Sequence, residues 1–397
     1  MFINSSWPLP DVPSTLIVDF DLFNVQPIDG DLHAGWHRYQ NGPPFFYTPL
    51  NGGHWVVTQA AAIFDVFRSP DIFSNSGVAL IRDAGEARFI PGELDPPRHA
   101  DFRAHLNPEA SPRRVKSFET QARQLAQELI DAVVGLGEIE FQSVIGHRLP
   151  IHNFLVFLGL PKEDSDILLP HVEIISRSPD AAAFQRAFFA LQSYLDERLE
   201  ERRATPRDDF LGRLVKAKIG ERQISIDECR ATAINVLLGG LDTVTASMGF
   251  FINFLARNPV HRRQLVDDPA LIPEAMEELF RRHGIFNTAR LVKEDCEFHG
   301  MHLRKSDLVL VPTALYNLDE KRFPRPLDVD FKRSDKNHLT FAVGIHRCLG
   351  SNFARVQLQV LLQEWLLRIP DFEIAPGRTT RVQSGRSNTV MELPLVW

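Results

Sequence analysis

FAVGIHRCLG, residues 341–350, is the stretch that decides the fold of this 397-residue chain. It is a glycine-bearing loop that runs into a segment with the spacing of an amphipathic helix. Cys348 therefore lies near a helix N-terminus, where unpaired N–H groups and the positive end of the helix dipole stabilise a thiolate. A thiolate is the form of cysteine that ligates metal, and Gly344 and Gly350 allow the backbone to approach a flat ligand closely.

A second motif lies in residues 231–257, which predict one long, largely apolar helix. Gly239 and Gly240 each cost about 1 kcal/mol relative to alanine inside a helix, and Asp242 and Thr243 follow almost at once. An unpaired carboxylate on a buried helix is expensive. Taken alone, the pair favours a structural interpretation, in which Thr243 hydrogen-bonds a backbone carbonyl and Asp242 pairs with a distant arginine.

Length and composition indicate a globular protein. Hydrophobic residues make up 44% of the chain, which is enough for a sizeable core, and the net charge of −7 gives no general attraction to nucleic acid or anionic lipid. The N-terminal segment lacks a signal-peptide pattern, and no run reaches the ~20 apolar residues of a membrane span. We therefore expect a cytoplasmic protein. Cys229, Cys296 and Cys348 are too few and scattered for a disulfide framework.

Local patterns predict a mainly α protein with a minor β part. Asn51-Gly52-Gly53 lies between two short β-prone runs and indicates a hairpin. Helical spacing begins at Ser117 and dominates afterwards, with single prolines between helices. Residues 295–312 alternate polar and apolar side chains and predict short strands, followed by a proline-bearing meander at 322–331.

The segment around Cys348 resembles the cysteine-ligand loop of the cytochrome P450 family, and GGLDT at 239–243 is similar to the family's oxygen-activation motif. The resemblance covers nearly the whole chain. It implies the cytochrome P450 fold, a single large, mainly α domain over residues 1–397 around a buried haem b, with small β-sheets. Ala342 stands where the family commonly has glycine, so we expect an altered turn there.

The resemblance also implies the role of each motif residue. By this resemblance Cys348 is the axial ligand of the haem iron. A thiolate in that position favours cleavage of the O–O bond over reversible oxygen carriage. Thr243 is the hydrogen-bonding alcohol at the dioxygen site, where the helix opens locally, and Asp242 relays protons. Phe341 packs beside the sulfur, and His346 or Arg347 meets a haem propionate. The expected haem-binding residues are His99, Arg103, Gly239, Arg290, Phe341, His346, Cys348 and Gly350.

Glu278 and Arg281 stand three residues apart on one predicted helix face. Such pairs are common on surfaces and contribute ~0.2–0.5 kcal/mol. In this position they resemble the family's E-x-x-R pair, which braces the proximal side of the haem. Asp328 occupies the place of the usual third partner, a basic or amide residue, so the third contact stays open.

Several stretches, AGEARFIP at 84–91 and ELPLVW at 392–397 among them, resemble the bacterial camphor hydroxylase branch. That branch is soluble and receives electrons from NADH through an FAD-containing reductase and a two-iron ferredoxin. The resemblance implies the same partners here, for a protein that we expect to be a monomer. The expected basic docking surface comprises Arg103, Lys332, Arg333, Lys336 and Arg347.

The chain departs from this branch at the substrate. The camphor enzymes use a tyrosine after AGEA to hydrogen-bond the ketone, whereas Arg88-Phe89 follows here and no tyrosine lies between residues 75 and 93. Loss of a buried donor changes specificity strongly. We expect camphor to be a poor substrate and another hydrophobic terpenoid, such as an ionone-like norisoprenoid ketone, to fit better. The expected pocket residues are Phe89, Asn235, Leu238, Phe286 and Arg386 or Ser387.

Three other classes are open to this sequence. A non-catalytic haem-thiolate sensor has no need of the Asp242–Thr243 pair. A peroxygenase is nearer, but peroxide-using relatives generally lack this pair. A cysteine hydrolase built on Cys348 and His346 would need an oxyanion arrangement that the neighbouring residues do not offer.

Overall fold

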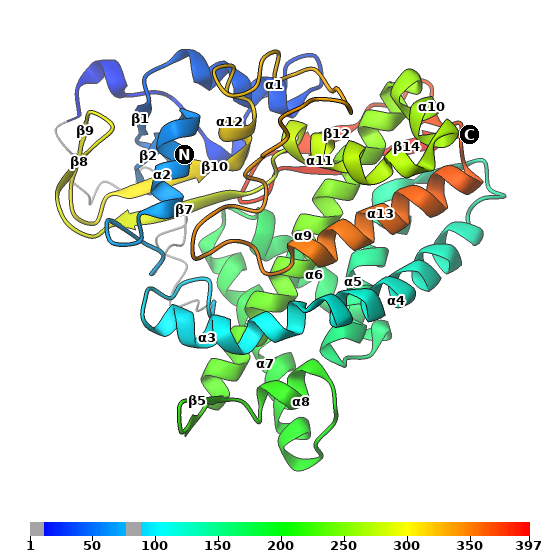
Figure 1. The fold of residues 1–397 in the computed structure, drawn as a ribbon, viewed down its shortest axis with the longest axis horizontal. Coiled ribbons are helices and arrows are strands. Elements are labelled where there is room, and N and C mark those ends of the chain that lie inside the picture. The colour runs from blue at the N-terminus through cyan, green and yellow to red at the C-terminus, as the bar shows by residue number, and fades with distance from the viewer. Residues whose placement is uncertain (1–11, 77–88) are drawn as a thin grey trace.

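The computed structural model describes residues 12–76 and 89–397, and α-helices dominate them (Figure 1). Residues 84–88, part of the stretch that lacks the tyrosine of the camphor enzymes, lie outside the described residues. The helices are α1 (Leu32–His37), α2 (Ala60–Arg68), α3 (Arg98–Leu106), α4 (Pro112–Asp131), α5 (Arg148–Leu158), α6 (Ser165–Arg177), α7 (Ala181–Ala204), α8 (Phe210–Leu214), α9 (Ile226–Arg257), α10 (Pro259–Asp267), α11 (Ile272–Arg282), α12 (Thr313–Asn317) and α13 (Ser351–Arg368).

The strands form small sheets. The largest has the order β1-β2-β10-β7-β3, with strands β1 (Phe45–Thr48), β2 (His54–Val57), β10 (Leu308–Pro312), β7 (Asn287–Val292) and β3 (Phe73–Ser74). A second has the order β11-β14-β4, with β11 (Glu373–Ile374), β14 (Pro394–Val396) and β4 (Glu138–Glu140). The remaining pairs are β5 (Lys218–Ile219) with β6 (Arg222–Gln223), β8 (Cys296–Phe298) with β9 (Met301–Leu303), and β12 (Arg381–Gln383) with β13 (Thr389–Glu392). The mainly α prediction with small sheets is confirmed.

The predicted hairpin is the antiparallel pair of β1 and β2, in register from Phe45 opposite Val57 to Thr48 opposite His54. Asn51, Gly52 and Gly53 all have positive φ in its turn, which is the conformation that glycine and asparagine adopt most readily. The sheet of which it is part lies to one side of the helices in Figure 1.

Helix α9 runs through the middle of the molecule. Its N-terminus is closed by a capping box, because Ser225 accepts a hydrogen bond from the Glu228 N–H and the Glu228 carboxylate accepts one from the Ser225 N–H. Gly240 allows α5 to pack closely, since a Cβ there would lie 2.1 Å from the Phe154 ring. Among the described helices, α9 alone is long and apolar enough to cross a membrane, contrary to the expectation that no run would qualify. However, 72% of its apolar stretch is buried inside the protein. It is therefore the core helix.

The expected local opening of this helix is not present. Helix α9 continues without interruption through Gly239 and Thr243. Thr243 Oγ1 donates a 2.8 Å hydrogen bond to the Gly239 carbonyl oxygen. That oxygen has a second lone pair, so the side chain bonds to it without displacing the helical hydrogen bond.

Candidate active site

A cavity of about 330 Å³ lies between α9 and the loop that precedes α13. Its walls bring together residues predicted from motifs that are far apart in the sequence. The predicted residues that line it are His99, Arg103, Asn235, Gly239, Thr243, Phe286, Arg290, Phe341, His346, Arg347, Cys348 and Gly350. Asp242 is the catalytic candidate that does not, because its side chain is directed to Arg177.

The loop at Cys348 is held by its own backbone. The Cys348 N–H donates to the Phe341 carbonyl at 2.9 Å, and the Arg347 N–H donates to Gly344 at 3.1 Å. Gly344 has a φ of +79°, and a Cβ there would lie 2.4 Å from the Phe67 carbonyl oxygen, so glycine is required. Ala342 adopts a left-handed conformation with a φ of +53°. Alanine tolerates this conformation with some strain, where glycine has none, and the altered turn stays a prediction.

Cys348 opens onto the cavity that it lines, and it precedes α13 as predicted. Burial raises the pKa of its thiol, while the Gly350 backbone N–H and the positive charges of Arg103, Arg347 and Arg355 act to lower it. The other cysteines differ. Cys229 is buried against the Leu214 carbonyl, with a pKa raised to about 11 by burial, and Cys296 is half-buried away from the cavity lining.

Two histidines face the cavity with unsatisfied nitrogens. The rings of His99 and His346 pack 4.2 Å apart, and within residues 12–76 and 89–397 neither Nε2 has a hydrogen-bond partner. Burial, together with nearby positive charge, lowers the pKa of His346 to about 3, so its ring is neutral. Buried Nε2 atoms of this kind call for an acceptor that the described side chains do not supply.

Two arginines lie on the same side of the cavity. Arg290, on β7, is buried, which lowers its pKa to about 10, and it has no ion-pair partner in the described part of the chain. Arg103 lines the cavity as well, and Cys348 is among the groups that favour its charge. A buried cation without a counter-ion is costly, so this end of the cavity suits a ligand with carboxylates.

These residues fit a haem. Where the structure describes the chain, no cluster of three or more His, Cys, Asp or Glu side chains could hold a metal by itself, so a single thiolate needs a macrocycle to complete the coordination. Gly239 has nothing within 4 Å of where a Cβ would lie, which leaves room beside α9 for a flat ring. The partnerless Nε2 atoms of His99 and His346, with the charge of Arg290, suit the two propionates of a haem.

Asp242 and Thr243 occupy different surroundings on α9. Thr243 faces the cavity. Asp242 is buried, and Arg177 Nη2 donates to its Oδ1 at 2.6 Å. Both contacts of the structural interpretation are therefore present: Thr243 bonds the Gly239 carbonyl and Asp242 pairs with Arg177. Thr243 still lines the cavity, whereas Asp242 does not.

The Glu278–Arg281 pair is fully buried, with Arg281 Nε 2.8 Å from Glu278 Oε2. Its third partner is Arg333, whose Nε lies 3.0 Å from Glu278 Oε1. The placement of Asp328 in that role is wrong, since Asp328 contributes only its backbone carbonyl, which accepts from Arg281 and Arg333. The backbone of the meander turns so that Arg333, five positions after Asp328, reaches Glu278. Sequence spacing alone does not predict this turn.

The predicted substrate residues fall into two groups. Asn235 and Phe286 line the cavity. Phe89 stacks edge-on against Phe188 with ring centroids 5.5 Å apart, and Ser387 is buried and pairs with Phe286 in an isolated β-bridge. These two and Leu238 are not among the lining residues.

Only some of the five residues predicted to form a basic docking surface are exposed and unengaged. Lys332 and Arg347 are exposed, and Arg347 also borders the cavity. Arg333 is engaged by Glu278, Lys336 is paired with Glu274 at 2.8 Å, and Arg103 faces the cavity, so these three are not free surface charges. The sequence carries no signal for this difference, because the partners come from other elements.

The sequence analysis did not name Arg177 and Arg355, and it placed Arg333 on a docking surface rather than on Glu278. Arg355 lies over the Phe341 ring, 4.5 Å from its centroid, and holds Glu277. A buried aspartate demands a cation, so the existence of a partner like Arg177 was foreseeable, but not its position.

Comparison with known proteins agrees with this geometry. The model of the cytochrome P450 family matches residues 162–393. The chain is 35% identical over 403 residues to a protein named probable cytochrome P450 127A1 from Sinorhizobium fredii, which covers 98% of this chain and 97% of the relative. The crystal structure of CYP101J2 matches with a TM-score of 0.91 and 34% identity over 98% of this chain and 99% of that one. The crystal structure of cytochrome P450 CYP101C1 matches with a TM-score of 0.90 and 33% identity, over 98% of this chain and 100% of that one.

The chain belongs to the cytochrome P450 family, and its neighbours support placement in the camphor hydroxylase branch. It is a cytochrome P450 monooxygenase, an oxidoreductase of a family that uses haem iron and dioxygen.

Proposed function

We propose that this enzyme hydroxylates a C–H bond of a small hydrophobic terpenoid, with an ionone-like norisoprenoid ketone as the favoured substrate rather than camphor. It acts in the cytoplasm as a monomer of one domain, and NADH supplies electrons through an FAD-containing reductase and a two-iron ferredoxin. The observation that carries the substrate class is the cavity wall over Cys348, which is largely apolar and includes the Asn235 amide.

The cofactor's place follows from its polar partners. Cys348 would hold the iron. His99 and His346, whose Nε2 atoms have no partner among the described residues, would receive the propionates together with the cationic Arg103 and Arg290 of the same cavity. Phe341 packs beside the sulfur, supported by Arg355. When bound, the haem supplies the iron centre at which dioxygen is reduced and its O–O bond is split.

Thr243 and Asp242 serve proton delivery. The Thr243 hydroxyl lies in the cavity wall, within reach of a small molecule there, and its bond to the Gly239 carbonyl holds its orientation. Asp242 is one residue away and paired with Arg177, so it passes protons only when that pair rearranges or through water.

Asn235 takes over the role that tyrosine has in the camphor enzymes. Asn235 belongs to the described lining, which also includes the apolar residues Val236, Val244 and Phe286. An amide N–H donated to a substrate ketone fixes the orientation of an otherwise apolar molecule. The pocket therefore favours a hydrophobic ketone over the hydrocarbon of the same shape.

Titration of the ferric protein by spin-state absorbance tests the substrate. We expect β-ionone to convert more of the haem to high spin than camphor does, and Asn235→Leu to weaken ionone binding about tenfold through loss of one hydrogen bond. The same variant leaves the affinity for a matched hydrocarbon nearly unchanged. Near-complete conversion by camphor would refute the substrate assignment.

The ligand assignment is tested by the carbon monoxide difference spectrum. Cys348→Ser loses the thiolate band, whereas Cys229→Ala, a change at a buried cysteine outside the cavity, retains it. Turnover that needs peroxide alone, and that is no faster with dioxygen and reductant, would instead support the peroxygenase alternative.

A further inference from the structure

Arg355, on α13, packs against the loop that leads to Cys348. The central carbon of its guanidinium lies 4.5 Å from the centre of the Phe341 ring, and the positive charge is attracted to the face of that ring. The carbonyl of Phe341 accepts the Cys348 N–H at 2.9 Å, and both residues line the haem cavity. A cation therefore rests on the residue that is hydrogen-bonded to the cysteine backbone.

Glu277, on α11, holds this guanidinium with two hydrogen bonds. Arg355 Nε donates to Glu277 Oε1 at 2.6 Å, and Nη2 donates to Oε2 at 2.9 Å. Such a paired contact fixes the plane of the guanidinium as well as its position. The two side chains are only 29% and 31% exposed, so solvent screens their charges less than it would on an open surface.

His338 completes the cluster without adding a charge. The Thr340 backbone N–H donates to His338 Nδ1 at 3.2 Å, so this nitrogen carries no proton. His338 Nε2 therefore donates to Glu277 Oε2, also at 3.2 Å. Burial lowers the pKa of this imidazole. Although burial opposes it, hydrogen bonds from Arg355 and His338 lower the pKa of Glu277 to about 2. The cluster thus holds one cation and one carboxylate beside the cysteine loop.

These two charges have opposite effects on an electron that enters the site. Reduction adds negative charge at the iron that Cys348 would hold, and a nearby cation favours that charge whereas a carboxylate opposes it. Charges and hydrogen bonds around an axial ligand are means by which a protein sets the potential of a haem. Arg355 and Glu277 are fixed in place by one another, so each acts from a defined position.

We propose that Arg355 and Glu277 are positioning residues that set the reduction potential of the iron at Cys348: Arg355 raises it, and Glu277 lowers it by offsetting part of that charge. The proposal rests on the proposed role of Cys348 as the iron ligand. The pair itself neither carries the electron nor exchanges a proton. It changes only how favourable the negative charge of the reduced site is.

Anaerobic spectroelectrochemical titration of the holoenzyme measures the potential directly. We expect Glu277→Gln to raise it and Arg355→Met to lower it, each by about tenfold in the equilibrium constant for reduction, or about 59 mV for one electron. Glutamine and methionine keep the side-chain length without the charge. A purely structural role would move both potentials in one direction, so shifts of the same sign, or no shift in either variant, would overturn the proposal.

Two further variants separate charge from packing. Arg355→Lys keeps the cation, and the double variant Glu277→Gln/Arg355→Met removes both charges, so we expect both to stay near the parent potential. If Arg355→Met does not fold with haem, Glu277→Gln and Arg355→Lys decide, because only the former should shift. The carbon monoxide difference spectrum shows that each variant contains thiolate-ligated haem before its potential is read.

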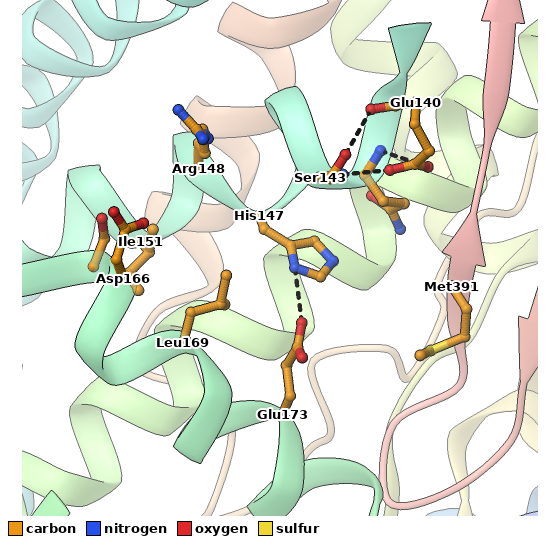
Figure 2. Close-up of a pocket in the computed structure, with 11 residues that line it drawn as sticks. Glu140, Ser143, His147, Arg148, Ile151, Asp166, Leu169, Glu173 and Met391 are labelled. Atoms are coloured by element: carbon orange, nitrogen blue, oxygen red, sulfur yellow. Dashed lines mark hydrogen bonds and ion pairs between the residues drawn. The ribbon is translucent and has the colours of Figure 1, made fainter.

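Matched controls remove the same negative charge elsewhere. Glu274, one turn before Glu277 on α11, is exposed and pairs with Lys336 at 2.8 Å. Asp166 lines a separate pocket of about 270 Å³ where α5 and α6 meet, and that pocket shares no residue with the lining of the haem cavity (Figure 2). Glu274→Gln and Asp166→Asn should both keep the parent potential. A rise equal to that of Glu277→Gln would show an effect of net charge alone and refute the proposal.

The dependence of this proposal on Cys348 is tested separately. If Cys348→Ser keeps the thiolate band, the ligand assignment fails and the role of the pair fails with it. If that band is lost but the potentials of Glu277→Gln and Arg355→Met do not shift in opposite directions, the ligand assignment stands and only the role of the pair is wrong.

Discussion

Arg333 Nε lies 3.0 Å from Glu278 Oε1, so an arginine of the meander completes the buried Glu278–Arg281 pair. Glu278 Oε1 also accepts from the Asp330 N–H at 3.0 Å and from Arg281 Nη2 at 2.9 Å. This carboxylate therefore ties α11 to the segment that leads into the cysteine loop.

Arg333→Ala should lower the free energy of unfolding of the holoenzyme by about 2 kcal/mol, because a charge-assisted hydrogen bond to a buried carboxylate is lost. Arg325→Ala is the matched control: Arg325 is in the same meander, but its side chain is 82% exposed and its ion pair with Asp328 contributes little. Urea denaturation measures both. Equal effects would show that Glu278 does not depend on Arg333.

Arg177→Met should destabilise the protein by about 3–5 kcal/mol, because it leaves the Asp242 charge buried without its hydrogen-bonded cation. Combining it with Asp242→Asn should recover much of that loss, which a double-mutant cycle of unfolding free energies measures. Strictly additive effects would mean that the ion pair is not coupled in solution.

The two adjacent glycines of α9 should respond oppositely to alanine. Gly240→Ala drives a Cβ into the Phe154 ring and should cost about 1–3 kcal/mol. Gly239→Ala meets no described atom within 4 Å and should stabilise the apoprotein helix by up to about 1 kcal/mol, while altering the haem absorbance. Thermal unfolding and the Soret spectrum distinguish the two. A stable Gly240→Ala protein would contradict the close packing of α5 on α9.

Acid should remove a stabilising contact beside the cysteine loop. Although burial opposes it, hydrogen bonds from Arg355 and His338 lower the pKa of Glu277 to about 2 from 4.5. A depressed folded-state pKa adds stability above the unfolded value, and this stability is lost as the pH falls from 4.5 toward 2. The free energy of unfolding of Glu277→Gln should therefore depend less on pH between 4.5 and 2. Tryptophan fluorescence measures the unfolding. An unchanged slope would rule out this linkage.

The sequence by itself determined the class of the protein and the order of its motifs. Cys348 before a helix, the Gly239–Thr243 run and the hairpin at Asn51 are local patterns, and local patterns follow from backbone geometry and helix termini. The same holds for the body of the long buried helix, predicted over 231–257, whereas its start at Ile226, after the Ser225–Glu228 capping box, was not predicted.

Only the tertiary structure decided which groups satisfy one another. Arg177 pairs with Asp242 and Arg333 with Glu278, although the members of each pair lie far apart in the sequence. Arg355, in α13, packs over Phe341 of the loop that precedes this helix. A buried charge requires a partner, but the choice among 44 lysines and arginines depends on how the helices pack. The same packing leaves His99 and His346 unpaired at the cavity, and so creates the place for the haem.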